Sequence, residues 1–326
     1  MRSTFVLRCV FAAFLIVLSA APAFASEWPN RPIHIVVPYP PGGGGDMITR
    51  GVGEALTRRF GQPVIVDNKA GATGAIGALA VARAPADGYT FLLTQVGPGV
   101  TAPLTQKGIA YDPIRDFTPI ILVGQTPVAL YVSVSSPFGA VADLVKYARA
   151  NPNKLDYGTP GVATPAHLAG ELFQRASGTR INHIPYKGSA STAPALLGGQ
   201  VAMVFDTLPP HIPLVKGGKT RALAVASAVR SNSLPDVVTM KEAGLGALEM
   251  SSWYAYAGPA GLPRAIVDAF NTAANVYIKS AEGSKRLDDI GLLPQRGGTP
   301  EEFAVFLKAE VAKLEPIIRG ANITID

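Results

Sequence analysis

Apolar and polar positions follow two patterns along this chain. Short apolar runs rich in β-branched residues predict strands, and segments whose apolar residues recur every three or four positions predict amphipathic helices. Helices are expected over 47–59 and 166–177, each stopped by a glycine, and from the capping box Thr299-Pro300-Glu301-Glu302 onward. The predicted strands cover residues 33–37, 64–66, 89–93, 120–123, 129–134, 155–157, 181–184, 201–205 and 222–226, with a weaker candidate at 254–257.

Strands and helices alternate through most of the chain, and this order predicts an α/β fold with mainly parallel strands. Two rounds of strand and helix without a low-complexity linker predict two lobes that are joined by strands. Ligands of such folds bind beyond the carboxyl ends of the strands. The loops that follow strands are therefore the first candidates for a site.

The first 25 residues have the pattern of a secretory signal peptide. Arg2 and Arg8 give a positive start, residues 9–20 form an uncharged apolar run, and Ala23-Phe24-Ala25 is a cleavage site of the A-x-A type. The run is shorter than the roughly 20 residues of a membrane span, which disfavours an uncleaved anchor. No later segment is long and apolar enough to cross a bilayer. We expect export and cleavage after Ala25, which would remove the single cysteine, Cys9.

Composition and charge narrow the function classes. A length of 326 residues, 48% of them hydrophobic, fits two domains of ordinary size and rules out a disordered chain. Without Arg2 and Arg8, 27 Lys and Arg face 23 Asp and Glu, a net charge of +4. This mild excess is compatible with an anionic solute. The dense basic stripe with interleaved aromatic residues that nucleic-acid binding requires is absent from the sequence.

Four consecutive glycines follow the first predicted strand. Pro38, Pro40 and Pro41 stiffen the exit from that strand. Gly42 to Gly45 lack a Cβ and can adopt positive φ, so backbone N–H groups can converge on a bound group. Asp46 is expected at the N-cap of the next helix. The free N–H groups and the positive end of that helix favour an anion such as a carboxylate or a phosphate.

Two more loops repeat this arrangement. Residues 157–165, with the sequence YGTPGVATP, lead from a strand into a helix, and Thr159 and Thr164 add hydroxyl groups. Residues 68–74, with the sequence NKAGATG, lead into a helix of small residues. One glycine-rich loop often only turns the chain. Three such loops, each in front of a helix, favour a binding site around one small solute.

The sequence lacks the common catalytic and nucleotide-binding motifs. G-x-x-x-x-G-K-[ST], G-x-G-x-x-G, G-x-S-x-G and H-E-x-x-H are absent, and the four histidines, at 34, 167, 183 and 211, lack metal-ligand spacing. We therefore expect no cofactor, no metal and no catalytic residue. Three side chains have two interpretations each. His167 contacts a ligand or bonds its own loop, Asp206 binds a ligand or caps the next turn, and Tyr39 lines the site or packs beside the prolines.

Several segments resemble, in their order along the chain, the periplasmic substrate-binding proteins of tripartite tricarboxylate transporters, also called Bug receptors. They are WPNRPIHIVVPYPPGGGGD, DNKAGATGAIGA, ADGYTFLL, YGTPGVATPAHLAGELF, HIPYKGSASTAPALLGGQVAMVFD and RALAVAS. The resemblance implies a two-lobed periplasmic binding protein fold, each lobe a mainly parallel sheet flanked by helices. Residues 26–124 with 248–326 would form lobe 1, and residues 125–247 lobe 2. It also implies a monomeric, non-enzymatic periplasmic receptor that binds a small organic acid between the lobes and delivers it to the membrane subunits of a transporter, without inserting into the membrane.

In that family the carboxylate is held largely by backbone amides and ordered waters instead of by an arginine clamp. Two departures from the family pattern stand out. The family commonly has a hydroxyl residue where Gly44 or Gly45 stands, and often Gly-Ser or Gly-Thr where Ala163-Thr164 stands. Carried onto this chain, the binding residues would be Tyr39, Pro41, Gly42, Gly43, Gly44, Asp46, Ala72, Thr73, Gly74, Thr159, Pro160, Gly161, Val162, Ala163, Thr164, His167 and Asp206.

Two other functions stay open from the residues themselves. A hydrolase or lyase on a similar two-lobed scaffold would use His167 and Asp206 as acid and base. An orphan sensor would bind the same kind of solute and signal to a partner other than a transporter.

Overall fold

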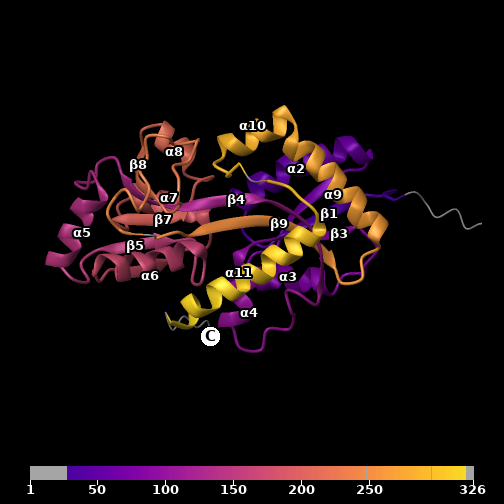
Figure 1. Cartoon of the computed structure of the whole chain (residues 1–326), viewed down its shortest axis with the longest axis horizontal. Helices are drawn as coiled ribbons and strands as arrows, with labels where there is room; N and C mark the ends of the chain where they lie inside the picture. Colours follow the sequence, from indigo (N-terminus) through magenta and orange to yellow (C-terminus); the bar gives the residue numbers. More distant parts are fainter. Residues whose placement is uncertain (1–27, 247, 295, 321–326) are drawn as a thin grey trace, which may run out of the picture.

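The computed structural model describes residues 28–246, 248–294 and 296–320, so the predicted signal peptide lies outside the described residues. Nine strands form one sheet in the order β2-β1-β3-β9-β4-β7-β5-β6, with β8 paired to β4 (Figure 1). The strands are β1 Ile33–Val37, β2 Val64–Asn68, β3 Thr90–Thr94, β4 Phe117–Ser133, β5 Asp156–Thr159, β6 Asn182–Pro185, β7 Met203–Thr207, β8 Thr220–Val225 and β9 Ser251–Pro259.

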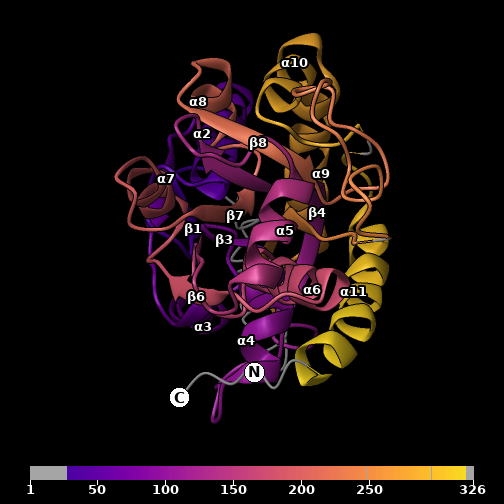
Figure 2. The same cartoon turned by 90° about the vertical axis from the view of Figure 1, so that its left-hand side faces the viewer.

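Helices cover both faces of this sheet. Seen from the side, α7 and α11 lie on opposite sides of β4 (Figure 2). The helices and helical turns are α2 Gly44–Phe60, η1 Ala72–Gly74, α3 Ala75–Ala82, η2 Gly97–Thr101, α4 Ala102–Thr105, α5 Val141–Ala150, α6 Pro165–Ser177, α7 Ser189–Leu197, α8 Ile212–Lys216, α9 Arg264–Lys279, α10 Ala281–Asp289 and α11 Pro300–Gly320. Within the described ranges, no helix combines the length and the apolar character that a bilayer span needs.

The prediction of mainly parallel strands was wrong, because the sheet is mixed. β1 pairs in parallel with β2 and β3, and β5 with β6 and β7. The pairings of β9 with β3 and β4, and of β4 with β7 and β8, are antiparallel. The cause is the path of two long strands. β4 runs through the middle of the sheet, and β9 returns beside it in the opposite direction.

The two strands predicted at 120–123 and 129–134 are one continuous strand, β4. Residues Gly124 to Pro127 between them have the composition of a turn, but they pair with Tyr254 to Ser251 of β9, and Thr126 is fully buried. The first part of β4 pairs with β9, and the part from Val128 onward pairs with β7 and β8. Tertiary pairing therefore overrides the local turn signal.

Two large hydrophobic clusters lie along this strand. One packs β1, β3 and the first part of β4 against α2 and α9 through residues such as Ile35, Phe91 and Phe270. The other packs the second part of β4 with β5 and β7 against α5 and α6, and it extends to α11. Trp253 of β9 packs edge-on against Phe303 and Phe306 of that last helix.

Several predicted element boundaries are confirmed. β1 spans the predicted residues 33–37. The capping box at the start of α11 is formed, because the Thr299 N–H donates to Glu302 Oε2 at 2.7 Å and the Glu302 N–H donates to Thr299 Oγ1 at 3.1 Å. α6 ends at Gly178, which has the positive φ of +62° that a glycine stop allows.

Candidate functional site

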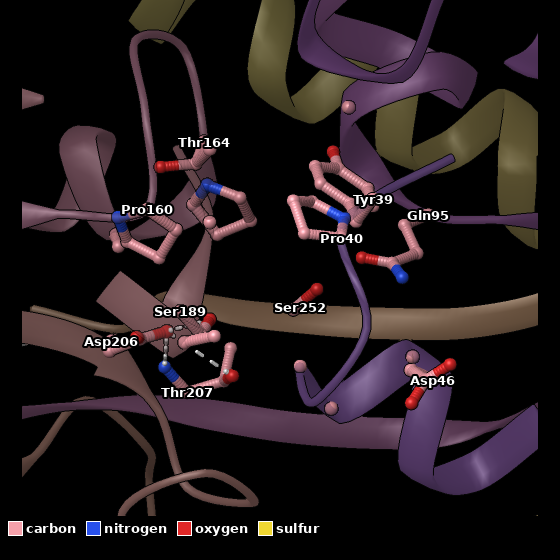
Figure 3. Close-up of a pocket in the computed structure, with 18 of the residues that line it drawn as sticks. Tyr39, Pro40, Asp46, Gln95, Pro160, Thr164, Ser189, Asp206, Thr207 and Ser252 are labelled. Atoms are coloured by element: carbon pink, nitrogen blue, oxygen red, sulfur yellow. Dashed lines mark hydrogen bonds between the residues drawn. The ribbon is translucent and has the colours of Figure 1, made fainter. Parts of the chain in front are cut away.

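The loops that follow β1, β5 and β6 meet the ends of β3, β7 and β9 around one cavity, here called the inner chamber (Figure 3). About 60 Å³ of it is accessible to the centre of a water molecule. Its walls are formed by Tyr39, Pro40, Gly43, Gly44, Gly45, Asp46, Gln95, Gly97, Pro160, Thr164, Pro165, Ala166, Gly188, Ser189, Ala190, Asp206, Thr207, Ser252 and Tyr254.

A second cavity, here called the outer chamber, adjoins the first. It shares Tyr39, Pro40, Pro160, Thr164 and Gly188 with the inner chamber, and about 560 Å³ of it is accessible to the centre of a water molecule. Its other walls are residues 70–74, 161–162 and 185–187. The third predicted loop thus lines the outer chamber and not the inner one.

Helix α2 begins earlier than the sequence predicts. Asp46 was expected at its N-cap, but the N-cap is Gly43 and the helix starts at Gly44. Asp46 lies in the first turn, almost completely buried, where its carboxylate accepts hydrogen bonds from the Gly42 N–H at 3.0 Å and the Asn68 side chain at 3.2 Å. The Arg50 guanidinium adds two more, at 2.9 and 3.0 Å. Asp46 thus ties the glycine loop to its helix.

These contacts set the charge of Asp46. Burial acts to raise the pKa of its carboxyl group, but the hydrogen bonds from Arg50, Gly42 and Asn68 outweigh burial and hold the pKa below its usual value. Because Arg50 compensates the carboxylate directly, Asp46 adds little negative field to the chamber.

The four glycines serve two different purposes. Only Gly42 has a positive φ, +84°, as the sequence argument required of the loop. Gly44 and Gly45 are needed for space, because a Cβ on Gly44 would collide with the hydroxyl of Tyr254, and a Cβ on Gly45 would collide with the side-chain amide of Gln95.

The second loop is braced by its own threonines. Thr164 is the N-cap of α6, and its Oγ1 accepts from the His167 N–H at 3.3 Å and donates to the Gly161 carbonyl at 2.8 Å. Thr159 is fully buried, and its Oγ1 lies 2.6 Å from Nε2 of His183. Thr164 lines both chambers, whereas Thr159 lines neither and supports the loop from behind.

Of its two interpretations, His167 follows the one in which it bonds its own loop, and it does not line either chamber. Its Nδ1 accepts the Ala163 N–H at 3.1 Å, and its ring stacks on that of His183 with centroids 3.9 Å apart. Burial lowers the pKa of His167, with Glu171 opposing that effect, and burial with the nearby His167 lowers the pKa of His183 to about 3. The hypothesis that His167 acts as an acid or base in the cavity loses its geometric support.

The histidine stack predicts acid sensitivity of the fold. A histidine whose pKa is lowered in the folded state does not affect the free energy of unfolding at pH values above its unfolded-state pKa of roughly 6.5. Below that pH the unfolded state binds a proton that the folded state does not bind, and the free energy of unfolding decreases. Stability should therefore fall as the pH drops from about 6.5 toward 3. In His183→Gln this loss should be smaller. Thermal unfolding at pH 8 and pH 5 measures it, and equal pH-dependent losses in variant and wild type would contradict the prediction.

Asp206 lies in the floor of the inner chamber and is only 1% exposed. Its carboxylate accepts from the Ser189 hydroxyl at 3.0 Å, from the Thr192 hydroxyl at 3.0 Å and from the Thr207 N–H at 2.7 Å. His211 Nε2 lies 3.1 Å from its second oxygen, and that ring stacks on Tyr131. Asp206 therefore holds Ser189 and Thr207 in place at the chamber wall (Figure 3).

The predicted binding residues are distributed unequally. Seven of them line the inner chamber: Tyr39, Gly43, Gly44, Asp46, Pro160, Thr164 and Asp206. Five more line only the outer chamber: Ala72, Thr73, Gly74, Gly161 and Val162. The remaining five line neither chamber: Pro41, Gly42, Thr159, Ala163 and His167.

Sequence reasoning missed the wall contributed by α7 and by strand ends. Gly188, Ser189 and Ala190 form a further glycine-to-helix junction, and this signal was available in the sequence. Gln95 directly follows β3, and Ser252 and Tyr254 lie in β9, where no local pattern marks them. Burial raises the pKa of both Tyr39 and Tyr254, so their hydroxyls stay protonated and can donate.

The electrostatics of the inner chamber come from backbone. The first residues of α2, α6 and α7 all line it, and each helix start brings free N–H groups and about half a positive charge. Among the described residues, none of those lining it is a lysine or arginine. The described part of the chain also holds no group of three or more metal-ligating side chains.

Comparisons with known proteins show the family of this chain. Residues 48–323 match the model of the tripartite tricarboxylate transporter family receptor. The chain is 34% identical to protein BugT of Bordetella pertussis over 301 residues, 92% of each chain, and 38% identical to a UPF0065 protein of Cupriavidus necator over 322 residues, 97% of each chain.

Solved structures show the same fold. R. palustris Rpa4515, solved with adipate, has a TM-score of 0.89 and 38% identity, covering 91% of this chain and 99% of its own. MatC of Rhodopseudomonas palustris, with bound malate, has a TM-score of 0.83 and 28% identity, covering 89% and 100%. The periplasmic binding protein BugD has a TM-score of 0.85 at 31% identity, covering 91% and 99%. The resemblance drawn from the sequence is confirmed, and the chain belongs to the tripartite tricarboxylate transporter receptor family, as a periplasmic solute receptor and not an enzyme.

Proposed function

We propose that this receptor binds a small organic carboxylate in the inner chamber and delivers it to the membrane subunits of a tripartite transporter. The observation that carries the proposal is that three helix N-termini meet at one chamber whose lining, in the described ranges, includes no lysine or arginine. An anion near a helix N-terminus gains typically 0.3–1 kcal/mol, and up to about 2 kcal/mol when partly buried. Three such ends, together with their N–H donors, can replace an arginine clamp.

The two acidic side chains in the lining are compatible with an anionic ligand. Asp46 is paired with Arg50, and Asp206 accepts hydrogen bonds from Ser189, Thr192 and Thr207 and lies against His211. A carboxylate whose oxygens are already bonded repels a neighbouring anion less than a free one. The structures of Rpa4515 with adipate and MatC with malate support the same ligand class.

The ligand would be captured by closure of two lobes. We assign the strands that pair with the first part of β4 to one lobe and those that pair with its second part to the other. Lobe 1 would comprise residues 26–124 and 248–326, and lobe 2 residues 125–247. The proposed lobes touch beside the chambers, since Thr73 Oγ1 donates to the Val162 carbonyl at 3.4 Å and Gly188 lies against Pro40. A ligand that touches both lobes only when they are closed shifts the equilibrium toward the closed form.

Binding without chemistry is the expected result of a solute screen. Malate, adipate and other small carboxylates, added at a hundred times the Kd, should stabilise the fold by about 2.7 kcal/mol, read as an increase in Tm. Mass spectrometry of the solution should recover each acid unchanged. The methyl esters of the same acids are the control, because they keep the shape and lose the charge. Conversion of an acid, or equal stabilisation by its ester, would contradict the proposal.

The remaining features of the proposal concern assembly and export. We propose a monomer that does not insert into the membrane or bind nucleic acid, exported with cleavage after Ala25. Intact mass and N-terminal sequencing of the secreted protein test the cleavage site. Capture of transporter membrane subunits by the ligand-loaded receptor tests delivery, and capture of a signalling protein instead would favour the sensor.

A further inference from the structure

Lys187 occupies a singular position in the binding region. Among the residues that line the two chambers in the described part of the chain, it is the only lysine or arginine. It lies in the outer chamber, next to Gly188, which lines both chambers. The inner chamber thus offers backbone dipoles, and the outer chamber offers one full positive charge.

The backbone on both sides of Lys187 is held firmly. The Tyr186 N–H donates to the Thr159 carbonyl and the Gly188 N–H donates to the Pro160 carbonyl, both at 2.9 Å. The Tyr186 hydroxyl lies 3.4 Å from the Gln200 side chain. These bonds attach the residue before and the residue after Lys187 to the second loop, so its place in the chamber does not depend on a mobile segment.

The ammonium group of Lys187 is available for a ligand. Its side chain is exposed, and within the described residues it forms no hydrogen bond or ion pair. By contrast, Arg50, which is bonded to a lining residue, uses its guanidinium on Asp46. An unpaired cation at the wall of a cavity attracts anions and can pair with a carboxylate that reaches it.

The residues that line both chambers are largely apolar. Four of them lie opposite one another, Tyr39 and Pro40 on one side and Pro160 and Thr164 on the other (Figure 3). Their rings and the Thr164 methyl group can contact a hydrocarbon segment, whereas a charged group between them would lose water without gaining a partner of opposite charge. A ligand that spans both chambers should therefore be polar at its ends and apolar in the middle.

We propose that Lys187 is a specificity-determining residue that binds the second carboxylate of an elongated dicarboxylate. One carboxylate lies at the helix N-termini of the inner chamber, the hydrocarbon chain passes between Tyr39 and Pro160, and the other carboxylate pairs with Lys187. This inference rests on the proposed function and adds the side chain, Lys187, that would favour straight-chain diacids over monoacids of the same length.

A comparison of matched acids on two lysine variants tests the role of Lys187. Calorimetric Kd values are measured for adipate and suberate and for their monoacid partners hexanoate and octanoate, on wild type, Lys187→Gln and Lys154→Gln. Lys154 is an exposed lysine outside both chambers, so its variant controls for the change in net charge. Lys187→Gln should weaken at least one diacid about fivefold and leave the monoacids within about twofold, while Lys154→Gln changes neither.

The outcomes separate this inference from the proposed function. Equal weakening of diacids and monoacids in Lys187→Gln, or no weakening of either diacid, would overturn the role of Lys187 and leave carboxylate binding intact. If wild type binds none of these acids or malate, the proposed function is overturned and this inference with it.

Discussion

Gly43→Val is expected to lose carboxylate binding by at least about a hundredfold while the ligand-free protein stays folded. Gly43 lines the inner chamber at the N-cap of α2 with φ −80° and ψ 169°, an extended conformation that valine adopts readily. A Cβ there would meet only the Pro40 carbonyl oxygen, at 3.9 Å. The isopropyl group would therefore occupy ligand space at an overpacking cost of about 1–3 kcal/mol, besides blocking N–H donors worth about 1.5–3 kcal/mol each.

Gly44→Val is the matched comparison for Gly43→Val. Its side chain would collide with Tyr254 and Pro209 instead of entering free space, so this variant should lose thermal stability even without ligand. Calorimetric titration with adipate or malate measures binding, and thermal unfolding measures the fold. An equal drop in Tm for both variants in the absence of ligand would show that the loop at Gly43 is architectural, and the prediction would fail.

Asp206→Ala is expected to lower the free energy of unfolding by about 3–5 kcal/mol, or Tm by on the order of 10 °C. The substitution removes the acceptor of two hydroxyls and one backbone N–H and leaves His211 buried without its carboxylate. His211 Nδ1 already has no hydrogen-bond partner among the described residues, so the ring would keep only the Thr192 hydroxyl, 3.3 Å from its Nε2. Chemical denaturation measures the difference.

A second aspartate–histidine pair in the same protein provides the control. Asp67 lies 2.8 Å from His34, a closer approach than in the Asp206 pair, but the side chains are 35% and 42% exposed. Solvent screening limits such pairs to at most about 1 kcal/mol, and Asp67→Ala should change stability by no more than that. If Asp206→Ala and Asp67→Ala lower the free energy of unfolding equally, burial of the Asp206 network does not add to stability, and the prediction is wrong.

The sequence predicts element boundaries correctly where interactions between neighbouring residues determine them. β1, the glycine stop after α6 and the capping box of α11 depend on neighbours a few residues away, and each was predicted. The start of α2 was misplaced for the same reason. A run of four glycines carries no capping side chain, and Asp46 bonds back to Gly42 from inside the helix, so the aspartate resembles a cap in the sequence.

Long-range pairing explains most of what the sequence did not reveal. Pro127 suggests a break, but β4 passes through it because β9, more than a hundred residues later, pairs with β4 up to Pro127, and β7 and β8 pair with it from Val128 onward. β9 also brings Ser252 and Tyr254 to the wall of the inner chamber. No sequence pattern near Ser252 and Tyr254 indicates that β9 lies beside β4, so the chamber walls formed by strand ends could not be inferred. The α7 junction differs, since Gly188-Ser189 repeats the design of the first two loops and was detectable.

Three register irregularities in β4 have a mechanical consequence. The ladder with β9 shifts between Pro119 and Ile121 and between Leu122 and Gly124, and the ladder with β8 shifts between Leu130 and Tyr131. Bulges of this kind interrupt hydrogen bonding and let a strand bend and twist locally. In the lobe closure proposed above, a change in strand curvature at these points would absorb the movement and leave the hydrogen bonds of the outer strands intact.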